Sequence, residues 1–444
     1  MADLSAIFKA YDIRGRTEGA LDLDAAYRIG GAFASWTGVG KAAVGRDCRL
    51  SSPGLASAFS DGARGQGTDV IDLGEIPTDV AYYYSGWADL PAAMVTASHN
   101  PPEWNGIKLS RAGAAPIGWD TGLQEIRDMA NVGLEEVGEG TLTHFHPIPG
   151  YVEHLLGIVD PELIEPLHVV ADGGNGMAGT TLPDVFARIP ARITGLYLDP
   201  DGTFPNHPAD PLQPANLRDL LQRMEEVGPD LGVAFDGDAD RAFFVDDQGR
   251  PLSGSTTTAL IAAWFLEREA GARVVHNLIT SRAVPETIRA KGGEPIRTRV
   301  GHSFIKEVMA DTEAVFGGEH SGHYYFRDNF RADSGMLALL VLLQVISEAG
   351  QPVSELRTQF EPYAQSPEIN LTVADQQKTL KAVEEAVPGG DVDHLDGLTV
   401  TWENRWFNLR PSNTEPVLRL NVEAPTPAAV EELVGTIKDL VEES

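Results

Sequence analysis

The sequence predicts an α/β protein built from several units with mostly parallel sheets. Two observations support this fold class. Short apolar runs bounded by turn residues alternate with longer amphipathic stretches, which is the pattern of strands alternating with helices. The chain also has 444 residues, and because domains usually hold roughly 100–200 residues, this length corresponds to about three domains.

Four short apolar runs are expected to form buried strands, and stretches between them are expected to form helices. The strand candidates are Ala92–Val95, Leu167–Ala171, Leu231–Phe235 and Val274–Leu278. The helix candidates are Asn216–Val227, Thr256–Glu269 and Met336–Ala349. The tail holds two extended runs and a charged helix, near Ile369–Val373, Leu398–Trp402 and Pro427–Glu443. We therefore predict a small α+β domain at the C-terminal end.

The composition excludes several kinds of partner. The chain carries 34 Lys and Arg against 65 Asp and Glu, a net charge of -31, whereas nucleic acids and anionic membranes require a basic surface. The single cysteine, Cys48, excludes an intrachain disulfide and a cysteine-based metal site. The apolar run Met336–Leu343 is much shorter than the ~20 residues of a membrane helix, and the N-terminus lacks a signal-peptide pattern. We expect a cytoplasmic protein with no nucleic-acid, membrane or obligatory protein partner.

A polar loop, Thr96–Pro101 (TASHNP), follows the first strand candidate directly. A serine at the carboxyl end of a parallel strand lies where open α/β sheets bind ligands, which makes Ser98 a functional candidate. Lys108 follows in the segment NGIK and could meet an anion near Ser98. The alternative is an ordinary turn in which Ser98 and Asn100 cap backbone groups.

Three aspartates alternate in the loop that follows the strand candidate Leu231–Phe235. The loop reads DGDADR, so that Asp236, Asp238 and Asp240 can converge on one hard cation. Mg²⁺ prefers such oxygen ligands. An EF-hand loop begins in the same way, but Arg241 stands here where that loop requires glycine. An acidic turn without a metal is the remaining alternative, and its carboxylates would repel one another.

A glycine-framed loop at residues 318–323 (GEHSGH) offers a carboxylate, a hydroxyl and two imidazoles. These groups suit a ligand with many hydroxyls and proton transfer near neutral pH. His302, in the upstream segment GHS, extends the set. A lone histidine such as His302 or His323 is equally consistent with a structural role.

A fourth candidate loop, RPSNTEP, begins at Arg410. A guanidinium followed by Ser, Asn and Thr between two prolines could hold a phosphate through charge and hydrogen bonds. An ordinary turn explains the same residues. Near the N-terminus, the segment KAYDIRG adds a tyrosine, Tyr11, and another cation, Arg14.

Together these segments resemble the α-D-phosphohexomutase family, in particular its bacterial phosphomannomutase and phosphoglucomutase members. The matching pieces run in family order from Lys9 to Pro416: KAYDIRG, TASHNP, NGIK, DGDADR, GHSFIK, GEHSGH and RPSNTEP. The resemblance implies four domains around a central cleft, three related α/β domains and a smaller C-terminal α+β domain. We place them at residues 1–147, 148–250, 251–362 and 363–444, each with one of the four candidate loops.

The resemblance also implies a role for each candidate residue. Ser98 would carry a phosphoryl group, and it would hold one Mg²⁺ per chain together with Asp236, Asp238 and Asp240. Arg241 would support the same site, and Glu319 and Ser321 would bind sugar hydroxyls. The non-reacting phosphate of the substrate would be held by Arg410, Ser412, Asn413 and Thr414. The reacting centre would be lined by Tyr11, Arg14 and Lys108, with His302 and His323 nearby.

The activity implied is the interconversion of hexose 6-phosphate and hexose 1-phosphate through a phosphoserine enzyme. Hexose 1,6-bisphosphate would be both intermediate and activator. The GEHSGH loop favours mannose over the glucosamine-type GEQSGH, and the general base stays open among Arg14, Lys108 and His323. The alternatives are a glucosamine or glucose mutase of the same family, a Mg²⁺-dependent sugar phosphatase, and a non-catalytic relative. One departure concerns a lysine that some members carry in the third domain, where this chain has Asn277–Thr280 (NLIT).

Overall fold

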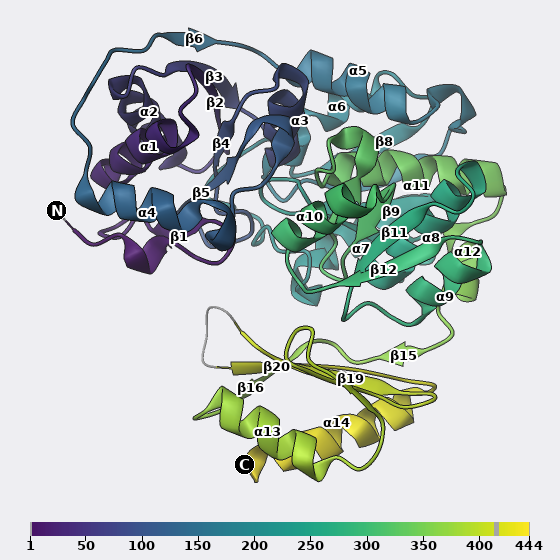
Figure 1. The fold of residues 1–444 in the computed structure, drawn as a ribbon. Coiled ribbons are helices and arrows are strands. Elements are labelled where there is room, and N and C mark those ends of the chain that lie inside the picture. Colours follow the sequence, from purple (N-terminus) through teal and green to yellow (C-terminus); the bar gives the residue numbers. More distant parts are fainter. Residues whose placement is uncertain (1, 413–416, 444) are drawn as a thin grey trace.

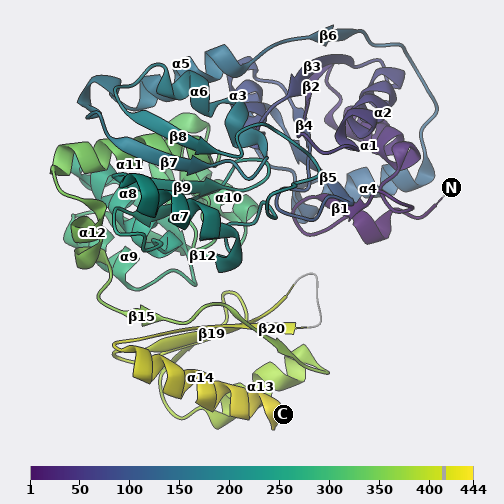
Figure 2. The ribbon, with the colours of Figure 1, turned by 180° about the vertical axis from the view of Figure 1, so that it is seen from behind.

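The computed structural model describes residues 2–412 and 417–443, apart from the side chain of His302. The described residues form four β-sheets, three of which lie together while the C-terminal one lies apart below them (Figures 1 and 2). The first three sheets are mixed and mostly parallel, and the fourth is antiparallel. The predicted fold class is therefore confirmed.

The first sheet contains six strands in the order β1-β5-β4-β2-β3-β6. The neighbours β4, β2, β3 and β6 are parallel, whereas β5 runs antiparallel to both β4 and β1. The strand bounds are β1 (Ile13–Arg16), β2 (Lys41–Arg46), β3 (Asp69–Glu75), β4 (Ala92–Val95), β5 (Trp104–Ser110) and β6 (Leu142–His144). The helices are α1 (Leu23–Thr37), α2 (Ser52–Gly65), α3 (Thr78–Ala88) and α4 (Leu123–Val132).

The second and third sheets have four strands each, in the orders β10-β9-β7-β8 and β12-β11-β13-β14. The second contains β7 (His168–Asp172), β8 (Arg192–Leu196), β9 (Leu231–Phe235) and β10 (Ala242–Asp246), with helices α5 (Ile148–Ile158), α6 (Leu182–Phe186) and α7 (Arg218–Val227). The third contains β11 (Arg273–Asn277), β12 (Glu294–Thr298), β13 (Phe316–Gly318) and β14 (Tyr324–Phe326). Its helices are α8 (Gly254–Arg268), α9 (Ala283–Ala290), α10 (His302–Thr312), α11 (Gly335–Ala349) and α12 (Val353–Leu356).

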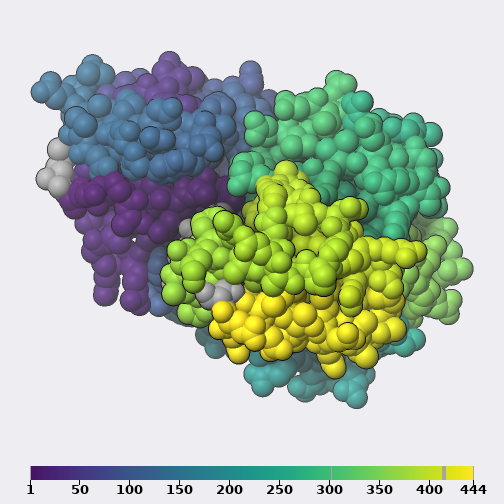
Figure 3. Space-filling model, turned by 60° about the horizontal axis from the view of Figure 1, so that its bottom comes forward, coloured from purple at the N-terminus to yellow at the C-terminus, as the bar shows by residue number. Residues whose placement is uncertain are grey.

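The fourth sheet follows the order β15-β20-β19-β18-β17, and β16 also pairs with β20. Its strands are β15 (Ala364–Gln365), β16 (Ile369–Thr372), β17 (Asp391–Asp393), β18 (Leu398–Thr401), β19 (Trp406–Pro411) and β20 (Val417–Ala424). Helices α13 (Gln376–Ala386) and α14 (Pro427–Glu442) cover one face, as Figure 2 shows. Seen from below, this part lies in front of the other three (Figure 3).

The predicted elements correspond closely to the observed ones. The strand candidates at 92–95 and 231–235 are β4 and β9 without any change of bounds. The helix expected from Thr256 begins earlier, because the Ser253 side chain accepts a hydrogen bond from the Thr256 amide and so caps the helix. The helix expected from Asn216 begins at Arg218 instead, after a 3-10 turn over Pro214–Leu217.

The apolar run Met336–Leu343 lies in α11, where every one of its side chains is buried. A helix that is apolar on all sides is stable in water only when it is enclosed, and α11 packs within the large core shared by the first three sheets. In the part of the chain that the structure describes, no single helix has the length and apolar composition to cross a bilayer, although α11 and Val353–Phe360 pass that test together as a bent pair.

Candidate active site

Ser98 lies in the turn after β4, with its side chain aimed at the loop after β9. Its Oγ donates a 2.7 Å hydrogen bond to Asp236. The backbone of Ser98 is left-handed, with φ of 52°, a conformation that costs energy in a residue other than glycine. The facing loop approaches so closely that a Cβ on Gly237 would lie 2.4 Å from the Ser98 carbonyl oxygen. Glycine at 237 therefore lets the two loops meet.

Arg49 holds the Ser98 turn from beneath, and nothing in its sequence context singles it out. Its guanidinium is fully buried, and all five N–H groups are used. One binds Asp47, and the others donate to the carbonyl oxygens of Ser98, Asn100, Pro101 and Trp104 at 2.6–3.1 Å. Since a single planar group binds four points of the loop, Arg49 fixes its shape.

The three predicted aspartates do converge. Asp236, Asp238 and Asp240, here called the acidic cluster, are buried, and their carboxylate oxygens lie within 4.8 Å of one another. One oxygen each of Asp238 and Asp240 (Oδ1) is buried without a hydrogen-bond partner among the described residues. Burial raises the pKa of Asp236 to about 7, with the Asp240 and Asp238 charges adding to the effect and Arg241 opposing it.

Lys108, on β5, is closer to the acidic cluster than the sequence indicates. Its Nζ lies 2.7 Å from Asp238 Oδ2 and 2.6 Å from Asp240 Oδ2. Burial opposes the lysine charge, but the two carboxylates outweigh it and raise the pKa of Lys108 well above its ordinary value. Burial acts to raise the pKa of Asp238, but the Lys108 charge and the Thr78 hydroxyl outweigh it, so the pKa of Asp238 is lowered. The Thr78 hydroxyl donates a 2.5 Å hydrogen bond to Asp238 Oδ2. Lys108 therefore supplies part of the neutralising charge.

Arg241 connects the acidic cluster to Ser98. Its Nε donates to Asp236 at 2.9 Å, and its Nη2 lies 3.4 Å from Ser98 Oγ and 2.6 Å from His99 Nδ1. Burial and the Arg241 charge lower the pKa of His99 well below its ordinary value. Because the guanidinium can only donate, His99 is a neutral acceptor at Nδ1. His99 is the second contributor that the sequence reasoning does not identify.

Arg14 stands beside this centre, whereas the contacts of Tyr11 are with the third part of the chain. Arg14 donates to Asn100 at 2.6 Å and forms an ion pair with Asp12 at 2.7 Å, so it contacts the far side of the Ser98 turn. The Tyr11 hydroxyl lies 3.2 Å from the carbonyl oxygen of Val300. Tyr11 thus joins the first part of the chain to the segment before α10.

The GEHSGH loop lies between β13 and β14. Glu319 is buried there, and its carboxylate accepts hydrogen bonds from Tyr325 at 2.8 Å and from Ser321 at 3.1 Å. Asn277, the first residue of the segment NLIT, contacts Glu319 at 3.5 Å. The carboxylate and hydroxyl expected to bind sugar are thus side by side.

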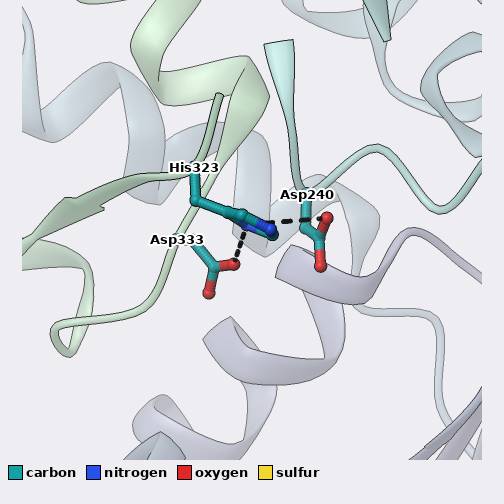
Figure 4. Close-up of side chains that lie close together, drawn as sticks. All are labelled: Asp240, His323 and Asp333. Atoms are coloured by element: carbon teal, nitrogen blue, oxygen red, sulfur yellow. Dashed lines mark hydrogen bonds and ion pairs between the residues drawn. The ribbon is translucent and has the colours of Figure 1, made fainter. Parts of the chain in front are cut away.

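His323, from the same loop, reaches the acidic cluster. Its Nδ1 lies 2.8 Å from Asp333 Oδ2 and 3.9 Å from Asp240 Oδ1 (Figure 4). Burial acts against its charge, but Asp240 and Asp333 outweigh that effect and raise the pKa of His323. His302 begins α10, and its side chain lies outside the described part of the structure.

The fourth candidate loop belongs to the C-terminal sheet. Arg410 is buried at the end of β19, where it donates to Asn421 at 2.9 Å and to Glu368 at 2.6 Å. The amide of Ser412 bonds the Val417 carbonyl at 2.9 Å. Asn413 and Thr414 lie outside the described residues. The structure therefore describes Arg410 and Ser412 as part of the C-terminal sheet.

Four family models match the chain in succession. They are described as phosphoglucomutase/phosphomannomutase α/β/α domain I at residues 5–135, domain II at 149–249, domain III at 253–363, and the C-terminal domain at 368–440. The chain belongs to the phosphoglucomutase/phosphomannomutase family. The resemblance seen in the sequence is thereby confirmed.

Individual members of this family match over nearly the whole chain. A protein of Xanthomonas campestris named "Phosphohexose mutases" is 40% identical over 431 residues, covering 95% of this chain and 96% of its own. A phosphomannomutase of Salmonella typhimurium is 38% identical over 430 residues, with 94% of each chain covered. A crystal structure of a phosphoglucomutase/phosphomannomutase family protein from Burkholderia thailandensis is 33% identical, with a TM-score of 0.92 and coverage of 99% and 97%.

The predicted residues of this family member fall into three groups. The first is Ser98 with the acidic cluster, Arg241 and Lys108, joined by direct contacts. His323 links the second group, which contains Glu319 and Ser321, to the first through Asp240. Arg410 and Ser412 form the third, in the C-terminal sheet. Sequence reasoning misses Arg49 and His99, although His99 stands next to Ser98 in the TASHNP motif.

Proposed function

We propose that Ser98 carries the phosphoryl group in this phosphohexomutase. The observation that supports this most is the direct contact of Ser98 Oγ with Asp236, in the presence of the Arg241 guanidinium. Phosphoryl transfer depends mainly on positioning and on neutralising the charge of the moving group. A hydroxyl held between a carboxylate acceptor and a cation, on a rigid turn, meets both needs.

The residues around Ser98 suit a hard divalent cation. Three carboxylates and a hydroxyl form an all-oxygen set, and two buried carboxylate oxygens of that set have no hydrogen-bond partner among the described residues. The family is Mg²⁺-dependent, and we propose that Ser98, Asp236, Asp238 and Asp240 hold one Mg²⁺ per chain. When bound, the metal ion would neutralise negative charge on the phosphoryl group.

In the proposed reaction, phospho-Ser98 gives its phosphoryl group to the free hydroxyl of a hexose 1- or 6-phosphate. The bond from phosphorus to Ser98 Oγ breaks, the bond to the sugar oxygen forms, and the hydroxyl proton passes to the neutral imidazole of His323. Burial opposes the charges of Arg14 and Lys108, but nearby carboxylates outweigh it and raise the pKa of both, so these two groups are already protonated and would stabilise negative charge instead. The resulting hexose 1,6-bisphosphate turns end for end and returns its other phosphoryl group to Ser98. The same bisphosphate would activate an enzyme whose serine is unmodified.

The remaining candidates would bind the substrate. Glu319 and Ser321, whose side chains hydrogen-bond each other, offer acceptors and a donor to sugar hydroxyls. Arg410 and Ser412, with Asn413 and Thr414 beyond the described residues, would hold the non-reacting phosphate. Tyr11 would close the reacting centre, and His302 would lie near it. We propose the four domains at residues 1–147, 148–250, 251–362 and 363–444.

Mannose is the proposed hexose, because relatives named phosphomannomutase match over nearly the whole chain and the loop reads GEHSGH. A coupled assay that compares mannose, glucose and glucosamine 1-phosphates tests this. We expect the highest kcat/KM with mannose 1-phosphate. A preference for glucosamine 1-phosphate would refute the sugar assignment, and release of inorganic phosphate without an isomeric product would indicate a phosphatase instead.

A further inference from the structure

A cavity of about 620 Å³ lies between the first and third sheets, beside the candidate active site. Its walls are the segment 111–121 after β5, the beginning of α10, and the turn at Phe330 and Arg331. Tyr11 also lines it, but in the described part of the chain its lining includes neither Ser98 nor any member of the acidic cluster. The volume falls in the range of roughly 300–1,000 Å³ that is usual for small-molecule sites.

Three arginines in this wall have no acidic partner in the part of the chain that the structure describes. Arg111, Arg299 and Arg331 come from three separate segments, and none has a carboxylate oxygen within 4.0 Å among the described residues. Asp120 and Glu307 line the same cavity without approaching any of them that closely. In a chain with 65 Asp and Glu against 34 Lys and Arg, most other arginines are ion-paired. Three arginines that line one cavity without nearby carboxylates favour an anionic ligand there.

Arg331 is held in this wall by a strained turn. Phe330 and Arg331 are consecutive left-handed residues, with φ of 56° and 61°. The Phe330 ring fits where α3 has Gly86, since a Cβ at 86 would lie 2.2 Å from the ring, and it stacks on His154 at 5.3 Å. Arg331 Nε is buried without a hydrogen-bond partner among the described residues. The packing of Phe330 therefore fixes the turn that places Arg331 in the cavity wall.

We propose that this cavity binds a small organic phosphate with an apolar body, of the nucleoside diphosphate class. Arg111, Arg299 and Arg331 would meet the phosphate groups. The body would pack against the apolar part of the wall, which includes Pro116, Phe304, Ala310 and Phe330. Two other kinds of anion fit this cavity less well. A sugar phosphate would place hydroxyl groups against the apolar wall, and an inorganic phosphate would leave most of the cavity volume unfilled. The ligand would join the first and third parts of the chain at Tyr11.

The test is calorimetric titration of the full-length protein with ADP in EDTA, which removes divalent cations from the acidic cluster. We expect one ADP per chain, bound also in the presence of saturating mannose 1-phosphate. Arg331→Ala and Arg299→Ala should each weaken binding about tenfold or more, since each removes a charge-assisted contact. Ala310→Trp, at an exposed position in the wall, should abolish binding by filling the cavity without changing its charge.

Arg192→Ala is the matched control, because Arg192 is an exposed arginine on β8 that also lacks a carboxylate partner among the described residues. It should bind ADP like the unmodified protein, and mutase activity without ADP should be unchanged in Arg331→Ala. The proposal is overturned if millimolar ADP produces no binding heat, or if mannose 1-phosphate displaces it. It is equally overturned if the Arg331 and Ala310 variants bind as tightly as the control.

Discussion

The buried guanidinium of Arg49 donates a 2.6 Å hydrogen bond to the carbonyl oxygen of Ser98. That carbonyl belongs to a residue with φ of 52°, so the bond stabilises a conformation that serine seldom adopts. The same carbonyl faces Gly237 of the loop that carries the acidic cluster. One arginine therefore fixes the distance and direction between the proposed phosphoryl carrier and its metal site.

Replacing Arg49 by lysine should lower kcat at least tenfold with little change in KM. Lysine cannot reproduce the planar set of five donors, so the Ser98 turn would relax while the substrate contacts remain. Steady-state kinetics measure this. Arg28→Lys is the control, since Arg28 is also buried and also binds backbone carbonyls, but those of Ala130 and Asn131. Equal losses of kcat in the two variants would show that Arg49 is only structural.

Asp238→Asn should shift the Mg²⁺ concentration needed for half-maximal activity upward by tenfold or more. The substitution removes a charge from the proposed metal site and leaves Lys108 ion-paired with Asp240 alone. Activity against Mg²⁺ concentration measures the shift. Asp246→Asn removes another buried carboxylate, one that is paired with Arg250 and Arg357, and should leave the titration unchanged. An unaltered Mg²⁺ requirement in Asp238→Asn would exclude Asp238 from the metal site.

Asp79 makes folding stability depend on pH. Burial raises its pKa to about 7, although Tyr151 and Ser334 hydrogen-bond its carboxylate. Because the folded pKa lies above the unfolded value of about 3.9, its contribution to stability is full below pH 4 and is lost as pH rises through 7. We therefore expect the free energy of unfolding of Asp79→Asn, taken relative to that of the unmodified protein, to increase by about 2–3 kcal/mol when the pH is raised from 5 to 8.

Urea unfolding of both proteins at the two pH values measures this difference. Asp246→Asn is the control, because the pKa of Asp246 is shifted in the opposite direction to that of Asp79. Burial acts to raise it, but hydrogen bonds and the Arg357 charge outweigh burial and lower it. Its contribution is present above the unfolded pKa, so that variant should gain nothing between pH 5 and pH 8. A free-energy difference for Asp79→Asn that stays constant with pH would mean that Asp79 titrates normally.

Sequence reasoning located the four loops because each has an unusual local composition next to a strand. The convergence of Asp236, Asp238 and Asp240 followed from their alternation after β9. Arg49 could not be found in this way, because an arginine is usually exposed and its burial results from contacts with a loop about fifty residues later. The position of Lys108 between two aspartates likewise depends on how the first and second sheets pack, which one sequence does not reveal.

Arg410→Ala should raise KM for the hexose phosphate about tenfold or more while kcat changes less. The proposed role of Arg410 is to bind the phosphate that does not react, and that contact is equal in the ground and transition states. Steady-state kinetics with mannose 1-phosphate measure both constants. Arg405→Ala, at a half-buried arginine just before β19, is the control. An unchanged KM would remove Arg410 from the substrate site.

The central claim is that Ser98 carries the phosphoryl group, and isotopic transfer tests it most directly. The protein is incubated with Mg²⁺ and hexose 1,6-bisphosphate labelled with ³²P, then digested, and the labelled peptide is identified. We predict label on the peptide containing Ser98, no label on Ser98→Ala, and loss of at least a thousandfold in its mutase activity. Ser110→Ala, at another buried serine, should label normally. Label on a different residue, or near-normal turnover by Ser98→Ala, would contradict the account.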